Sequence, residues 1–151
     1  MRAQDLGLTG AAKAAATRLE RDHPDLVFTS GRRSVAEQAR AMAANVLRNR
    51  RWIEATYAAT AESRSLQAWL DDHPAAAPAG EIADGLATIM SAWSDDRKAR
   101  LSKHFSGQAF DVRPVGGARG AIIKAAIRCS PGLTKFLERE GGLVRWHAQF
   151  E

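Results

Sequence analysis

The stretch Ser102-Lys103-His104-Phe105-Ser106-Gly107-Gln108-Ala109-Phe110-Asp111 predicts a metal site, and the rest of the chain is interpreted from it. His104 and Asp111 lie seven residues apart, and Trp146-His147 near the C-terminus adds a second imidazole. Two nitrogen donors and one oxygen donor suit a catalytic zinc ion, which takes three protein ligands and keeps a fourth position for water or substrate. Gly107 removes side-chain bulk where the backbone has to wrap closely round an ion.

The same residues resemble a known family. The pattern Ser-x-His-x-x-Gly-x-Ala-x-Asp followed by Trp-His is similar to that of zinc peptidases of bacterial cell walls, namely D-Ala-D-Ala carboxypeptidases, D,D-dipeptidases and L-Ala-D-Glu endopeptidases, including phage endolysins. The matching positions are Ser102, His104, Gly107, Ala109 and Asp111. The resemblance implies that His104, Asp111 and His147 are the zinc ligands. It also implies an α+β fold, in which a small antiparallel sheet carries the zinc site and several helices pack around it.

An upstream segment, Ser30-Gly31-Arg32-Arg33-Ser34 with Gln38, also resembles the family, which carries Ser-Gly-Tyr-Arg-Ser-x-x-x-Gln. Arg33 falls where the family keeps a substrate-binding arginine, and its bidentate fork suits a carboxylate or carbonyl oxygen of a peptidoglycan stem peptide. Gln38 and Ser102 are expected to orient the substrate or to support the ligands, since metal ligands need partners that fix their geometry. The resemblance therefore implies a zinc metallopeptidase, either an L-Ala-D-Glu endopeptidase or a D,D-carboxypeptidase.

One departure from the family pattern concerns catalysis. Family members carry Glu or Asp three residues before the last histidine as the general base, and this chain has Val144 there. Glu140 is the predicted catalytic substitute, because the two glycines after it would let the chain fold back toward the metal. Glu151, four residues after His147, is the second candidate. The alternative is a catalytically weak or inactive protein that zinc stabilises and that binds the cell wall.

The length of the chain bounds its domain organisation. A chain of 151 residues is most simply one domain that buries a core without disulfides. We predict a single zinc peptidase-like domain over residues 1–151, with a variable helical insertion around 52–100. The only cysteine, Cys129, excludes an internal disulfide, and we expect it to be a small buried residue.

The N-terminus bears on where the protein acts. It lacks the charged segment followed by an apolar run that marks a signal peptide, and no window approaches the roughly 20 apolar residues of a membrane span. We therefore expect the protein to be made in the cytoplasm without stable membrane insertion, and we expect it to be a monomer. As an endolysin it would act on the cell wall after release, with a holin-type pore as a partner for export.

The basic character of the chain indicates an acidic partner. The net charge is +5 and the pI is near 10.0. An anionic cell wall fits this charge together with the family resemblance. A nucleic acid is the distant alternative, because Arg48-Asn49-Arg50-Arg51-Trp52 places three arginines beside an aromatic residue. Such a basic run at a helix C-terminus usually stays solvated, so no nucleic acid is expected.

Apolar periodicity and turn residues predict the secondary structure. Ser34-Val35-Ala36-Glu37 reads as a capping box that starts a helix. We expect helices at 11–19, 35–46, 61–73, 82–93, 121–127 and 133–138. We expect strands at 26–29, 110–115 and 143–150. The last strand would place His147 beside the strand that bears Asp111.

Overall fold

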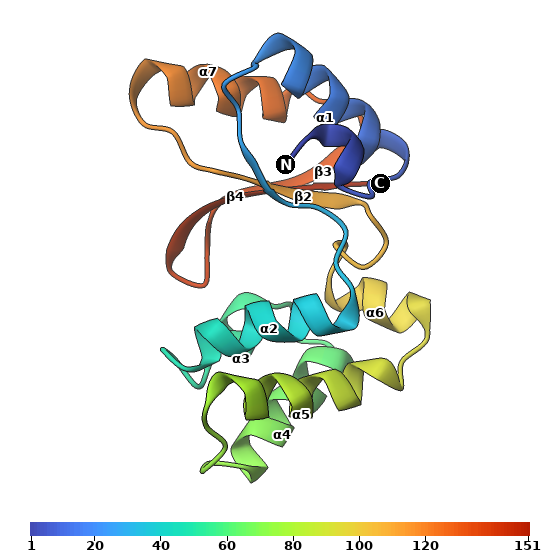
Figure 1. The fold of residues 1–151 in the computed structure, drawn as a ribbon, viewed down its shortest axis with the longest axis vertical. Helices are drawn as coiled ribbons and strands as arrows, with labels where there is room; N and C mark the ends of the chain where they lie inside the picture. Colours follow the sequence, from blue (N-terminus) through green and yellow to red (C-terminus); the bar gives the residue numbers. More distant parts are fainter. The chain divides into compact units, whose positions relative to one another are not determined.

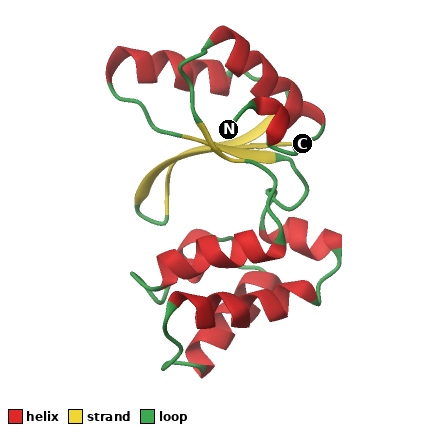
Figure 2. Ribbon diagram, in the orientation of Figure 1, coloured by secondary structure: helices red, strands yellow, loops and turns green.

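The computed structural model describes residues 1–151 and confirms the α+β fold class. It contains seven α-helices, a short 3-10 helix and a four-stranded sheet (Figures 1 and 2). The chain divides into two compact units. Unit 1 comprises Met1–Arg32 and Ser106–Glu151, and unit 2 comprises Arg33–Phe105. The predicted insertion at 52–100 falls within unit 2.

Unit 1 contains the sheet, whose strands are all antiparallel and lie in the order β1-β2-β4-β3. The strands are β1 (Phe28–Ser30), β2 (Ala109–Val112), β3 (Leu133–Glu140) and β4 (Leu143–Phe150). The helices of this unit are η1 (Ala3–Asp5), α1 (Gly10–Asp22) and α7 (Gly117–Arg128). The two central strands, β2 and β4, come from sequence segments more than 30 residues apart, so the middle of the sheet depends on long-range pairing.

One face of the sheet packs against α1 and α7 and forms the core of unit 1 (Figure 2). The core side chains from β2 and β4 are Phe110, Val112, Trp146, Ala148 and Phe150. Side chains alternate between faces along a strand, so the residues between these point to the opposite face. Asp111 and His147 are two of them, and they are direct partners in the β2–β4 register. The apolar face therefore fixes which polar side chains share the other face.

Unit 2 is helical. Its elements are α2 (Val35–Val46), α3 (Trp52–Thr56), α4 (Ala61–Asp72), α5 (Ala79–Ser91) and α6 (Asp95–Leu101). The predicted capping box is present, because Ser34 Oγ accepts from the Glu37 amide and the Glu37 carboxylate accepts from the Ser34 amide. The hydrogen bond from the Ser34 amide lowers the pKa of Glu37. The core includes Met42, Val46, Ile53, Leu66, Leu70, Ile82, Leu86 and Met90.

Arginines after α2 have structural contacts within unit 2. The Arg50 guanidinium donates to the carbonyls of Leu70, His73 and Ala76 at 2.9–3.0 Å, which satisfies the end of α4 and the following turn. Arg51 pairs with the carboxylates of Glu54 and Asp71. These two side chains of the basic run are therefore engaged in the fold of the unit itself.

Two predictions from the sequence are wrong. Residues 133–138 form part of strand β3 rather than a helix, because the turn at Gly141 and Gly142, both with positive φ, lets this segment pair with β4 over its full length. Pairing with a partner strand overrides the helix preference of Leu, Lys and Glu. Cys129 is exposed at the end of α7 rather than buried.

None of the helices combines the length and the apolar character that crossing a membrane requires.

Candidate metal centre

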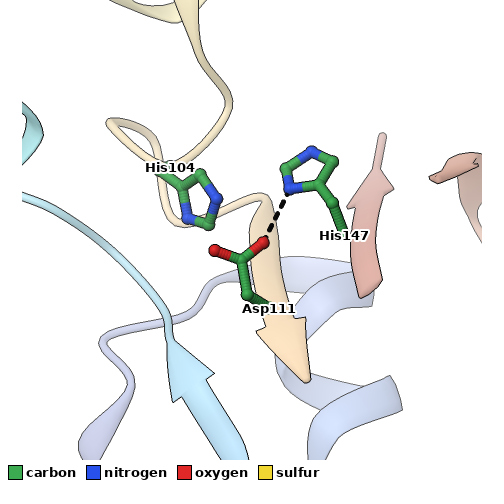
Figure 3. A group of neighbouring side chains, drawn as sticks. All are labelled: His104, Asp111 and His147. Atoms are coloured by element: carbon green, nitrogen blue, oxygen red, sulfur yellow. Dashed lines mark hydrogen bonds and ion pairs between the residues drawn. The ribbon is translucent and has the colours of Figure 1, made fainter. Parts of the chain in front are cut away.

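The structure brings His104, Asp111 and His147 together (Figure 3). One ligand atom from each, a ring nitrogen or a carboxylate oxygen, lies within 4.8 Å of those of the other two. All three residues are buried, with exposed fractions of 3%, 2% and 6%. Buried charged or polar side chains need compensating partners, so a cluster of two imidazoles and a carboxylate is a candidate site for a cation.

The sheet register positions two of the three side chains. Asp111 in β2 pairs directly with His147 in β4, on the face that α1 and α7 do not cover. A hydrogen bond of 2.9 Å joins His147 Nδ1 to Asp111 Oδ1. The neighbouring residues Phe110 and Trp146 are buried in the apolar core, so neither strand can slip by one residue without turning the site side chains into that core.

The third side chain, His104, comes from the segment between α6 and β2. The His104 amide donates to Ser102 Oγ at 3.3 Å, and the His104 carbonyl accepts from the Arg33 amide at 3.1 Å. Ser102 therefore contacts the backbone of His104. The contact with Arg33 ties the upstream arginine motif to the backbone of a predicted ligand.

Gly107 shows why the segment between His104 and β2 needs a glycine. Its φ of +75° lies in the left-handed region, which side chains with a Cβ rarely adopt. A Cβ at this position would lie 2.7 Å from the Gly7 carbonyl oxygen, and the Gly107 carbonyl itself accepts from the Thr9 amide. The close approach that requires this glycine is therefore to the segment before α1.

The donor set fits a zinc ion. Zinc binds imidazole nitrogen and carboxylate oxygen at about 2.0–2.2 Å, which separates tetrahedral ligands by roughly 3.3 Å. The three ligand atoms lie within 4.8 Å of one another. Side-chain rotations that move these atoms by about an ångström are therefore enough to reach the spacing of zinc ligands. Three protein ligands would leave one coordination position for water or substrate, as at catalytic zinc sites.

The predicted supporting residue Gln38 is buried in unit 2, with an exposed fraction of 1%. Its Oε1 accepts from Arg33 Nη1 at 3.2 Å, and its Nε2 donates to the hydroxyl of Tyr57 at 2.8 Å. Both ends of the amide are therefore engaged, and Gln38 fixes the side chain of Arg33. Tyr57 lies outside every motif of the sequence, so its contact with Gln38 could not be predicted; it follows from the packing of α2 and α3.

Glu140 and Glu151 do not join the three-residue cluster. Glu140 pairs with Leu143 at the tip of the β3–β4 hairpin, four residues from His147 along β4, or about 13 Å at 3.3 Å per residue. It is also two residues from Glu138, which contacts Lys124 and Arg128 of α7, so both glutamates lie on the helix-facing side of β3. Glu151 is exposed beyond the other end of β4.

Val144, by contrast, shares a face with His147. The β3–β4 register runs from Leu137 opposite His147 to Arg139 opposite Val144, which is two residues on β3 and three on β4. Because of this β-bulge in β4, Val144 and His147 point to the same face of the sheet although they are three residues apart. A side chain at position 144 therefore belongs to the metal-site face of the sheet, where the chain presents a valine with an exposed fraction of 56%.

Comparison of the chain with protein-family models, with curated proteins and with solved structures finds no match.

Proposed function

We propose that the protein is a zinc-dependent peptidase that hydrolyses a peptide bond in the peptidoglycan stem peptide, as an endolysin does. The observation that supports this most is the buried cluster of His104, Asp111 and His147, in the order and spacing of the family that the sequence resembles. When bound, zinc would act as a Lewis acid toward the peptide carbonyl and lower the pKa of a coordinated water to about 7.

The side chains around the cluster would bind and orient the substrate. Arg33 is the proposed partner of a stem-peptide carboxylate or carbonyl oxygen, because a guanidinium forms bidentate, charge-assisted hydrogen bonds with such groups. Gln38 would keep this guanidinium in one orientation, since its amide is shared between Arg33 and Tyr57. Ser102 would keep His104 in place through its backbone amide.

The identity of the general base decides how fast such an enzyme works. Hydrolysis of a peptide bond needs a group that takes a proton from the attacking water, and a positioned carboxylate contributes about 10²- to 10⁴-fold. Glu140 was predicted for this role, but it lies at the hairpin tip on the helix-facing side of β3. Position 144 shares the face of His147 and carries valine. We therefore infer slow hydrolysis in which bulk water, rather than a positioned carboxylate, takes the proton from the attacking water.

A second candidate function follows from the same observation. A zinc-stabilised protein that binds the cell wall without cutting it would need the metal ligands and the basic charge, but no base at position 144. The net charge of +5 suits an anionic wall in either case. A nucleic-acid partner has less support, because Arg50 and Arg51 of the basic run are engaged within unit 2.

The test is the release of peptide fragments from purified peptidoglycan by zinc-loaded protein, with mass analysis to name the bond. We expect slow release by the wild type, none by His147→Ala, and release about 10²- to 10⁴-fold faster by Val144→Glu. Glu140→Ala is expected to match the wild type, and a loss of activity there would reinstate Glu140 as the base. If neither the wild type nor Val144→Glu releases fragments while both sediment with the wall, the binding function replaces the peptidase.

A further inference from the structure

The hydroxyl of Ser30 is a buried polar group with no hydrogen-bond partner, one strand away from Asp111. Four buried side-chain atoms lack a partner, namely His23 Nδ1, Ser30 Oγ, Trp52 Nε1 and Thr56 Oγ1. Of these, only Ser30 belongs to a strand of the sheet, and its partner in the register is Asp111. A buried hydroxyl without a partner is costly, so its presence beside a candidate metal ligand needs a reason.

A β-bulge directs Ser30 toward the metal-site face. In the β1–β2 pair, Phe28 lies opposite Val112 and Ser30 lies opposite Asp111, so two steps along β1 correspond to one step along β2. A regular register would place Ser30 opposite Phe110, on the same face as Phe28 and in the apolar core. Because of the extra residue, Ser30 instead points to the same face of the sheet as Asp111. Bulges near functional sites commonly redirect a side chain in this way.

The distance between paired residues suits a hydrogen bond from serine to aspartate. Directly opposite residues of an antiparallel pair have Cβ atoms about 4.5–5.5 Å apart, and a hydroxyl donates to a carboxylate over about 2.5–2.7 Å. A carboxylate can accept up to about four hydrogen bonds. Asp111 Oδ1, which is bonded to His147 Nδ1, belongs to such a carboxylate, so a small rotation of either side chain could add a hydrogen bond from the Ser30 hydroxyl.

We propose that Ser30 is a positioning residue for Asp111 in the metal-loaded site. On metal binding, the Ser30 hydroxyl donates to the Asp111 carboxylate and fixes the orientation in which Asp111 coordinates the ion. Metal-ligating carboxylates are typically hydrogen-bonded by such outer residues. The role rests on the zinc site of the proposed function, but not on peptide hydrolysis, so it applies equally to a wall-binding protein.

The experiment measures the zinc dissociation constant of metal-free protein by competition with a chromophoric chelator. Loss of an outer hydrogen bond to a ligand weakens metal binding about 10- to 100-fold, and this is the change expected for Ser30→Ala. Ser30→Thr and Ser30→Val form a matched pair of nearly equal shape, of which only threonine keeps the hydroxyl. Ser30→Thr should bind zinc as the wild type does, and Ser30→Val should resemble Ser30→Ala.

Thr56→Ala is the matched control, because it removes another buried hydroxyl without a partner, at the end of α3. It should leave zinc affinity unchanged. The metal-free denaturation midpoint of Ser30→Ala should be equal to or higher than that of the wild type, since the variant loses an unsatisfied polar group and no hydrogen bond. A purely structural serine would lower this midpoint instead.

The proposal would be overturned if Ser30→Ala bound zinc as tightly as the wild type. It would also be overturned if Ser30→Ala and Thr56→Ala lost zinc affinity equally. A loss of affinity in Ser30→Thr as large as in Ser30→Val would overturn it as well. If the wild type itself binds no zinc, the metal site and the role of Ser30 both fail. That result differs from a failure of Ser30 alone, in which the wild type binds zinc and Ser30→Ala binds it equally well.

Discussion

Two buried carboxylates, Asp111 and Glu62, differ in the side chains that surround them. Their exposed fractions are 2% and 3%. Glu62 at the start of α4 is paired with the guanidiniums of Arg97 and Arg100, each at 3.2 Å. Asp111 is instead grouped with two imidazoles. A guanidinium keeps its proton in proteins, whereas a neutral imidazole is a common metal ligand. Equal burial therefore gives a permanent ion pair in unit 2 and a candidate metal site at Asp111.

The largest expected effect separates the two carboxylates by their response to zinc. At a free zinc concentration 100 times the dissociation constant, the free energy of unfolding of the wild type should rise by about 2.7 kcal/mol. Asp111→Asn should lose this increment, because it removes a ligand. Glu62→Gln should be less stable without metal and should keep the increment. Denaturant unfolding with and without zinc measures the increment in both variants. An increment that survives in Asp111→Asn would show that Asp111 is not a zinc ligand.

A smaller effect is expected from one glycine in each region, Gly85 in unit 2 and Gly107 in the segment between His104 and Asp111. A Cβ at Gly85 in α5 would lie 2.0 Å from Trp69 Cζ2, and a Cβ at Gly107 would lie 2.7 Å from the Gly7 carbonyl oxygen. Overpacking typically costs about 1–3 kcal/mol, so Gly85→Ala and Gly107→Ala should both lower stability by this order. Only Gly107→Ala should also weaken zinc binding, because Gly107 shapes the segment between two ligands.

The zinc dissociation constants of the two alanine variants, measured by chelator competition, test this difference. Equal zinc affinity in both variants would show that the backbone around Gly107 does not shape the metal site.

The smallest expected effect is the pH dependence that Glu62 gives to stability. Its own backbone amide, together with Arg97 and Arg100, lowers the pKa of Glu62 below the ordinary value of about 4.3. A lowered pKa in the folded state stabilises the protein above the ordinary value, and this contribution is lost as the pH falls through the folded-state pKa. The stability difference between wild type and Glu62→Gln should therefore shrink below about pH 4.3.

Urea unfolding midpoints of zinc-free wild type and Glu62→Gln, measured from pH 7 to pH 3, provide the check. Asp25, Glu37 and Glu138, whose pKa values are also lowered, contribute equally to both proteins and so cancel in the difference. A difference that stays constant with pH would mean that the arginines do not stabilise the charged form of Glu62.

The sequence predicted the elements whose signals are local. Ser34 and Glu37 form the capping box that their spacing indicates, and His104, Asp111 and His147 are close together as their motifs suggest. What depends on pairing between distant segments could not be predicted. Residues 133–138 have a helix-like composition, and they form a strand only because β4 pairs with them.

The placement of Glu140 has the same physical cause. From composition alone, Glu140 and the two glycines after it suggested a loop that folds back toward the metal. The structure places Glu140 in the last pair of a hairpin, where strand alternation decides its face. The β-bulges that direct Ser30 and Val144 toward the metal-site face likewise arise from strand pairing, in β1–β2 and in β3–β4. They could not be predicted from the sequence of a single strand.

The most direct measurement is a zinc titration of the metal-free protein and four single-histidine variants, His23→Ala, His73→Ala, His104→Ala and His147→Ala, which cover every histidine of the chain. We expect one zinc ion per wild-type chain. We also expect binding to be lost in His104→Ala and His147→Ala and to be unchanged in His23→Ala and His73→Ala. Wild-type binding in either His104→Ala or His147→Ala, or no binding by the wild type, would contradict a metal site at Asp111.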